Sequence, residues 1–205
     1  MCPPTSFIED PNSYHSVAKK LNQETPNSFM PDQYFNTVNT LAHYSHLGPE
    51  LYKQTNGEIT HFFAGAGTGG TVTGVGKYLK EQNPNIKVIA VDSVNSFRTT
   101  KGNPKPYRVE GLGIDFISPV INYDFIDEVA TVSDDDAIAM LNTLSRKGPL
   151  LGPTSGAVAH VAYEYAQKFM GPSDKGVVMF ADSGRAYLSK GFYKESVVHR
   201  HNTFT

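Results

Sequence analysis

A glycine-rich loop between a short apolar run and an amphipathic segment constrains the fold of this chain more than any other feature. The run Ile59–Ala64 has the length and composition of a buried strand, and Thr71–Gln82 carries apolar side chains at helical spacing. Between them lies the sequence Gly65-Ala-Gly-Thr-Gly-Gly-Thr71. The glycines let the backbone turn tightly, and the first N–H groups of the following helix stay unpaired and point at one spot. A turn without a ligand is the simpler alternative, but so many glycines and threonines favour a phosphate site.

The order of the other segments extends this unit into an α/β fold. The helix ends at Asn83-Pro-Asn85, and the apolar run Ile86–Val91 is the next strand, which gives one β-α-β unit and hence a parallel sheet. Further strands are predicted at Glu128–Val132 and Gly176–Ala181, and further helices at Tyr14–Glu24, Ala42–Gln54, Ser133–Arg146, Gly156–Phe169 and Ala186–Phe192. Residues 93–108 are polar and irregular, which is typical of a loop. We therefore expect a three-layer α/β domain, a mostly parallel sheet with helices on both faces.

Composition excludes several classes of protein. The formal net charge of −2 offers no general attraction to nucleic acid or to anionic membranes. No apolar stretch reaches the roughly 18 residues that a membrane span requires, and nothing resembles a signal peptide. Cys2 is the only cysteine, and His43, His46 and His61 have no acidic or cysteine partners at ligand spacing. We therefore expect a cytoplasmic protein with no metal site and with neither nucleic-acid nor membrane partners.

The glycine loop alone is compatible with a dinucleotide site. Gly65, Gly67 and Gly70 satisfy the pattern G-x-G-x-x-G between a strand and a helix. Asp92 follows the next strand, about where an acid that binds a ribose belongs. This pattern is weak when it stands alone. An NAD-binding enzyme is therefore one interpretation, and the surrounding residues must support or exclude it.

Five motifs in order along the chain favour another interpretation of the glycine loop over a dinucleotide site. They are the stretch Asp32–His43, the loop Gly67–Thr71 with its helix, Glu110–Gly113 with Asp115-Phe116, Leu151–Ala157, and Phe180–Arg185 with Tyr187-Leu-Ser. In register from about residue 10 to residue 193, the chain resembles the cystathionine β-synthase and cysteine synthase family, whose fold places pyridoxal phosphate between two α/β domains. The resemblance outweighs the single dinucleotide pattern.

The resemblance implies roles for particular residues. The cofactor phosphate would lie in the loop Gly67, Thr68, Gly69, Gly70 and Thr71, and the ring nitrogen would meet the hydroxyl of Thr154. Gln33 falls at a position that contacts the substrate carboxylate, and Gly111 lies in the segment beside the substrate. Thr154 departs from the family's usual serine, and Pro153 before it removes a backbone donor.

The lysine that holds the cofactor in this family is not found in its expected context. Family members carry it in a stretch like Asn-Pro-…-Ser-x-Lys-Asp-Arg, followed by a Ser/Thr-Gly-Asn loop, and neither occurs here. Lysines considered instead are Lys19, Lys20, Lys77, Lys80 and Lys190, and none has that context. The resemblance thus implies a truncated fold type II large domain, with residues 1–34 as the remnant of the small N-terminal domain and residues 35–205 as the large cofactor-binding domain.

These observations predict a function with two alternatives. The leading one is a protein like the pyridoxal-phosphate-dependent β-replacement enzymes, which make cysteine or cystathionine from serine or an activated serine and a thiol. We expect it to be inactive alone, to hold the cofactor without a covalent bond, and to form a homo-oligomer or pair with a complete family member. The alternatives are a non-catalytic binding or interaction module of the same fold and the NAD-binding enzyme.

Overall fold

Four parallel strands form the central sheet of the chain, in the order β3-β2-β1-β4. The computed structural model describes residues 2, 3, 5 and 7–193. The strands are β1 (His61–Gly65), β2 (Lys87–Ser93), β3 (Glu128–Val132) and β4 (Gly176–Val178). In the register of the sheet, Phe62 lies opposite Val88 and Val177. The predicted parallel α/β sheet is confirmed.

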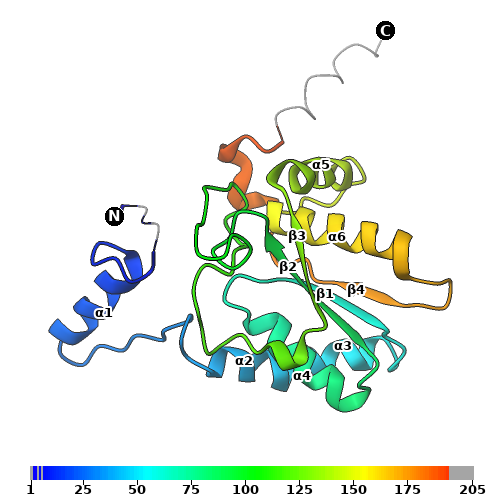
Figure 1. Cartoon of the computed structure of the whole chain (residues 1–205), viewed down its shortest axis with the longest axis horizontal. Helices are drawn as coiled ribbons and strands as arrows, with labels where there is room; N and C mark the ends of the chain where they lie inside the picture. The colour runs from blue at the N-terminus through cyan, green and yellow to red at the C-terminus, as the bar shows by residue number, and fades with distance from the viewer. Residues whose placement is uncertain (1, 4, 6, 194–205) are drawn as a thin grey trace, which may run out of the picture.

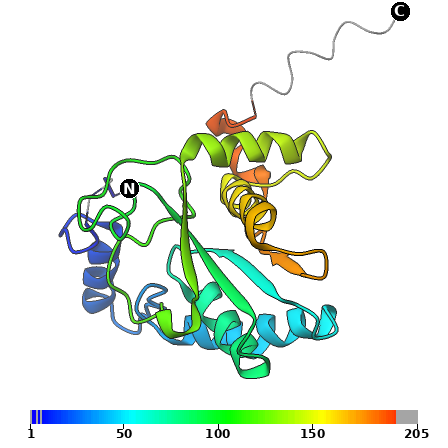
Figure 2. The same ribbon diagram turned by 45° about the vertical axis from the view of Figure 1, so that its right-hand side comes forward.

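Helices cover both faces of this sheet (Figure 1). One face carries α2 (Val38–Ala42), a π-helix (His43–Leu47), α3 (Gly48–Gln54) and α4 (Gly70–Gln82). The opposite face carries α5 (Asp134–Ser145) and α6 (Pro153–Phe169). The view turned by 45° shows the same three layers from a second side (Figure 2). The structure thus confirms the three-layer arrangement that the sequence predicts.

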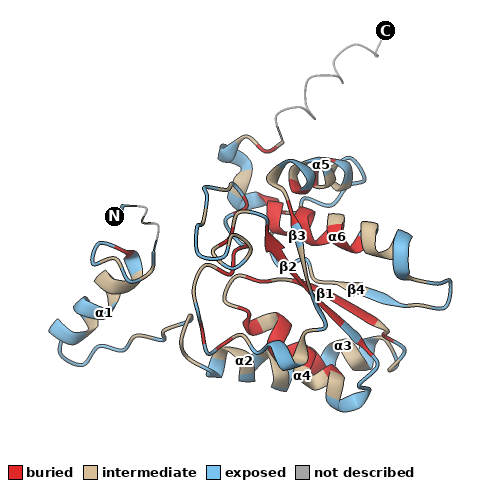
Figure 3. Ribbon diagram, in the orientation of Figure 1, coloured by how far each residue is buried: buried red, intermediate tan, exposed pale blue. Residues whose placement is uncertain are grey.

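Alternating side chains of the strands build a separate core on each face. Phe62 and Ala64 of β1 pack with α4, whereas Phe63 between them packs with α6. Strand β2 repeats the pattern, with Val88 on the first face and Ile89 on the second. Both faces are covered, so the strands read as continuous apolar runs. The buried residues accordingly concentrate in β1, β2 and the sides of α4 and α6 that face the sheet (Figure 3).

Several element boundaries differ from those that the sequence predicts. The helix expected at residues 42–54 starts at Val38 and contains the π-helical turn. Helix α6 starts at Pro153 rather than Gly156, since a proline at the first helical position loses no hydrogen bond. Strand β4 ends at Val178, and the predicted last helix is a 3-10 helix at Gly184–Lys190. A second 3-10 helix, Tyr123–Phe125, precedes β3.

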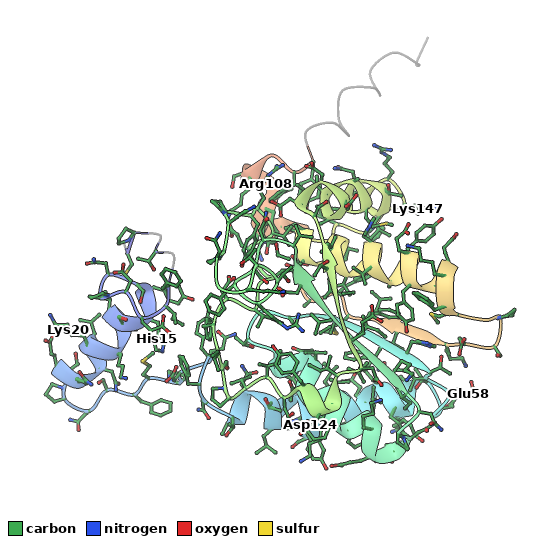
Figure 4. All side chains as sticks on the ribbon, viewed as in Figure 1. His15, Lys20, Glu58, Arg108, Asp124 and Lys147 are labelled. Atoms are coloured by element: carbon green, nitrogen blue, oxygen red, sulfur yellow. The ribbon has the colours of Figure 1, made fainter. Side chains whose placement is uncertain are left out.

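The N-terminal segment lies beside the body of the protein. Helix α1 (Tyr14–Glu24) begins at Ser13, whose hydroxyl accepts a hydrogen bond from the backbone N–H of Ser16, and none of its residues is buried. Figure 4 labels His15 and Lys20 on this segment. The ring of His15 forms a hydrogen bond with the carboxylate of Asp32 (3.1 Å). None of the helices in the described part of the chain has the length and apolar character to cross a membrane.

Candidate functional site

A cavity of about 820 Å³ lies where β1 ends and the glycine loop begins. Four further segments line it: the N-terminal segment, the loop at residues 104–116, the start of α6, and the segment after β4 with Met179 and Ala181. The structure brings all the predicted binding residues together around this cavity, namely Gln33, Gly67, Thr68, Gly69, Gly70, Thr71, Gly111 and Thr154. The volume falls in the range of about 300–1,000 Å³ that small-molecule sites occupy.

The glycine loop presents an uncapped helix end to the cavity. Gly69 precedes α4 with φ of 83°, and no side chain caps the helix there. A Cβ on Gly69 would lie 2.5 Å from the Cβ of Ile121, so both the backbone angle and this neighbour require glycine. The N–H of Gly70 bonds to the Thr68 hydroxyl, and the other N–H groups of the first turn have no partner within the helix. Together with the positive end of the helix dipole, they favour an anion at this position.

Asn39 braces this loop from outside. Its side-chain amide donates to the backbone carbonyl of Gln33 (2.8 Å) and to the hydroxyl of Thr68 (3.2 Å). The same hydroxyl oxygen accepts a hydrogen bond from the N–H of Gly70 (3.3 Å). Because both lone pairs of the Thr68 oxygen are then engaged, its own proton remains to be donated to a ligand. Asn39 thus couples Gln33 to the glycine loop.

Thr71 is held by a histidine on the neighbouring helical segment. Its hydroxyl lies 3.2 Å from Nε2 of His43. Partial burial lowers the pKa of His43, which keeps the imidazole neutral at neutral pH. A neutral ring can donate its one N–H to Thr71 and leave the threonine proton free to point into the cavity.

Thr154 carries a buried hydroxyl without a partner. The residue is 6% exposed, and its Oγ1 has no hydrogen-bond partner among the described residues. The carboxylate of Asp182 accepts from the backbone N–H groups of Thr154 (3.0 Å) and Ser155 (2.8 Å), which fixes the start of α6. A Cβ on Gly111 would lie 2.2 Å from Oγ1, so only glycine leaves this hydroxyl clear. An unsatisfied buried hydroxyl costs about 1–3 kcal/mol, and a ligand acceptor in the cavity would remove that cost.

Sequence reasoning missed a second group of cavity residues in the loop at 104–116. The hydroxyl of Tyr107 contacts the carbonyl of Leu112 (3.0 Å) and the carboxylate of Asp115. Burial, together with the hydrogen bond to Asp115, raises the pKa of Tyr107. A Cβ on Gly113, whose φ is 116°, would collide with this hydroxyl. The segment Glu110–Phe116 was part of a motif in the sequence, but no local pattern predicted that Tyr107 contacts it.

The structure gives Asp92 an internal role. Its side chain is fully buried and accepts hydrogen bonds from the N–H groups of Ser93 (2.8 Å) and Ile114 (3.0 Å) and from the hydroxyls of Ser96 (2.7 Å) and Thr99 (3.1 Å). The carboxylate therefore holds the loop after β2, and it has no capacity left for a ribose. This geometry weighs against the dinucleotide interpretation.

None of the lysines named in the sequence analysis lines the cavity. Lys19 and Lys20 are in α1, Lys77 and Lys80 in α4, and Lys190 at the end of the last 3-10 helix. Among the described residues, Lys105 is the lysine that lines it. The same part of the chain contains no group of three or more histidine, cysteine or acidic side chains placed to hold a metal ion.

Comparison with known proteins places this chain in a family. The family described as "Pyridoxal-phosphate dependent enzyme" matches residues 6–182. Cystathionine beta-synthase of Apis mellifera is 40% identical over 194 residues, which are 92% of this chain and 38% of that protein. Cysteine synthase B of Campylobacter jejuni is 36% identical over 176 residues, 86% of this chain and 58% of that protein.

A solved structure agrees with the sequence matches. The O-acetylserine dependent cystathionine beta-synthase from Helicobacter pylori superposes with a TM-score of 0.84 at 35% identity, and the match covers 93% of this chain and 61% of that one. The chain thus spans between 38% and 61% of the length of these relatives. Pyridoxal phosphate is the cofactor of the family. From the matched residues, the parallel fold and the cavity together, we conclude that this chain belongs to the family of pyridoxal-phosphate dependent enzymes.

Proposed function

We propose that this chain holds pyridoxal phosphate in the 820 Å³ cavity without a covalent bond, as a protein related to the β-replacement enzymes. One observation carries the proposal: the cavity lined by the glycine loop is also lined by Thr154, whose buried hydroxyl has no partner among the described residues. The loop suits an anionic group, and the hydroxyl suits a neutral acceptor. Pyridoxal phosphate has both, as a phosphate and a ring nitrogen.

The phosphate would be held by backbone and hydroxyl donors. N–H groups of the loop Gly67–Thr71 would donate to its oxygens, and the free protons of Thr68 and Thr71 would add two charge-assisted hydrogen bonds. Asn39 and His43 would keep these two hydroxyls oriented. No basic side chain lies in this loop, so the affinity would depend on how well the backbone is pre-organised.

The ring and the substrate would meet other sides of the cavity. The Thr154 hydroxyl would donate to the ring nitrogen, and its place at the fixed start of α6 limits its movement. The side-chain amide of Gln33 would bind the substrate carboxylate, and the backbone at Gly111 would pass beside the substrate. Bound pyridoxal phosphate supplies an electron sink for charge that develops on the substrate α-carbon.

The reaction also needs a base that takes the α-proton, which in this family is the cofactor's lysine. The motif that carries this lysine does not occur in the sequence. We therefore propose that the chain binds the cofactor but does not catalyse the β-replacement of serine or an activated serine by a thiol on its own. Residues 1–34 would correspond to part of the smaller domain and residues 35–205 to the larger, and a second copy or a complete relative would be its partner.

Two vitamers that differ only in the phosphate test this proposal. Pyridoxal phosphate and pyridoxal are titrated separately into the protein, and binding is followed by calorimetry. We expect pyridoxal phosphate to bind at least about tenfold more tightly, because each charge-assisted hydrogen bond contributes roughly 1.5–3 kcal/mol. Equal affinities, or binding of neither compound, would show that the glycine loop is not a phosphate site.

A further inference from the structure

The last segment that the structure describes, residues 183–193, contacts two walls of the cavity from outside. We call this segment the strap; it contains the 3-10 helix Gly184–Lys190 and lies beside α5 and α6 (Figure 1). None of the strap residues, all of which are described, lines the cavity. The strap instead contacts the chain next to two residues that do line it, Gly111 and Thr154.

The first of these contacts is with the segment that leads into α6. The hydroxyl of Tyr193 donates to the backbone carbonyl of Leu151, three residues before Thr154. Burial raises the pKa of Tyr193, so the hydroxyl stays protonated and remains a donor at neutral pH. The N–H of Gly184 donates to the carbonyl of Leu150 (3.0 Å), and a Cβ on Gly184 would lie 2.5 Å from the Tyr193 hydroxyl. Tyr193 therefore packs closely against this segment and restricts the position of Thr154.

The second contact is with the loop that carries Gly111. The ammonium group of Lys190 pairs with the carboxylate of Glu110, the residue before Gly111. The guanidinium group of Arg108 lies over the ring of Phe192, 5.2 Å from its centroid. The strap thus connects this loop to the start of α6.

The strap is itself anchored in the protein. Phe192 is 6% exposed, and its backbone carbonyl accepts a hydrogen bond from the side-chain amide of Asn142 in α5 (3.2 Å). The ring of Tyr187 packs against the ring of Phe192, with centroids 6.0 Å apart. Because these contacts fix the end of the strap, Tyr193 has a fixed base from which it can hold the neighbouring segment.

We propose that the strap holds the Thr154 hydroxyl in place for the ring nitrogen of the cofactor, and that Tyr193 is the positioning residue through which it does so. Gly111 and Thr154 approach so closely that a Cβ on Gly111 would lie 2.2 Å from the Thr154 hydroxyl oxygen. A shift of either wall therefore moves this hydroxyl relative to the cavity. The inference rests on the proposed function, because it concerns the contact between Thr154 and a bound cofactor ring.

Two ligands that differ only at the ring nitrogen test the inference. Pyridoxal phosphate and its 1-deaza analogue, in which C–H replaces the ring nitrogen, are titrated into the full chain and followed by calorimetry. We expect the wild-type chain to prefer pyridoxal phosphate about fivefold, as one hydrogen bond allows. Tyr193→Phe should reduce this preference to about twofold or less and leave the affinity for the analogue within about twofold of the wild-type value. Tyr44→Phe, which removes a tyrosine hydroxyl bonded to Glu81 (2.7 Å) outside the cavity lining, should keep the preference.

A double substitution shows whether Tyr193 acts through Thr154. Thr154→Val removes the hydroxyl and should abolish the preference for pyridoxal phosphate. Tyr193→Phe added to Thr154→Val should then change neither affinity by more than about twofold, because residues that act through one contact are not additive. A further loss of pyridoxal phosphate affinity in the double variant would contradict this route.

The outcomes separate this inference from the proposed function. An unchanged preference in Tyr193→Phe, or an equal loss of affinity for both ligands, overturns the role of Tyr193 and leaves the cofactor site standing. Equal binding of the two ligands by the wild-type chain overturns the contact of Thr154 with the ring, and this inference with it, but leaves the phosphate site. Binding of neither ligand overturns the proposed function as well. Circular dichroism spectra show that each variant chain is folded in these comparisons.

Discussion

Replacement of Thr154 by valine should change stability and cofactor binding in opposite directions. Valine has the shape of threonine, so Thr154→Val exchanges the unpartnered buried hydroxyl for a methyl group without opening a cavity. Relief of an unsatisfied buried hydroxyl should stabilise the chain without cofactor by about 1 kcal/mol. For a chain of this size that corresponds to a rise in melting temperature of about 2–4 °C. Loss of the hydrogen bond to the ring nitrogen should weaken pyridoxal phosphate binding about five- to tenfold.

Two control variants isolate the hydroxyl. Thr143→Val alters an exposed threonine on α5, whose hydroxyl bonds to the carbonyl of Ala139 (3.0 Å) far from the cavity lining, and it should leave cofactor affinity unchanged. Thr154→Ser keeps the hydroxyl and should retain binding. Urea denaturation without cofactor gives the stabilities, and fluorescence titration gives the affinities. A Thr154→Val chain that is less stable than wild type and binds pyridoxal phosphate equally well would refute the reasoning.

Three further predictions concern the lysines, a histidine and the assembly. After incubation with pyridoxal phosphate and borohydride reduction, peptide mapping should find no lysine labelled as the single predominant site, and one such site would contradict non-covalent binding. Because burial lowers the pKa of His43 below the value of about 6.5 in the unfolded chain, the unfolded state binds more protons as the pH falls and stability decreases. In His43→Gln this loss between pH 7.5 and 5.5, measured by urea denaturation, should be smaller, and an equal loss would exclude His43 as its source. The outer strands β3 and β4 have no further partner strand among the described residues, and α1 buries none of its side chains. We therefore expect self-association, measured by sedimentation at low micromolar concentration. A monomer with cooperative unfolding would argue against an incomplete fold.

Local signals in the sequence predicted most of the elements. Apolar residues at helical spacing between Pro11 and Pro26 indicated helix α1 with the bounds that the structure shows, and the apolar run before the glycine loop indicated β1. Where the local signals misplaced the start of a helix, a contact with a distant residue explains the difference. Helix α6 starts three residues early because Asp182, 28 residues along the chain, binds its first N–H groups. Such a contact leaves no trace in the spacing of neighbouring residues.

In the candidate site, too, local motifs predicted some residues, and contacts between distant residues determine the roles of others. The glycine loop and Thr154 stood in recognisable motifs, and the structure places them around one cavity. Asn39 lies within the motif Asp32–His43, but its bond to Thr68 spans 29 residues, and the local sequence does not predict it. Asp92 matched a ribose-binding pattern, yet four internal donors saturate it, and only the folded loop reveals this.

The central claim, that the cavity is built for pyridoxal phosphate, can be tested by one calorimetric comparison. Pyridoxal phosphate and NAD are titrated into separate samples of the same purified chain, and each is then added to protein saturated with the other. The account predicts a saturable one-to-one heat for pyridoxal phosphate and none for NAD, because the glycine loop and Thr154 fit the first ligand and Asp92 has no free capacity for a ribose. Binding of NAD without binding of pyridoxal phosphate would contradict it.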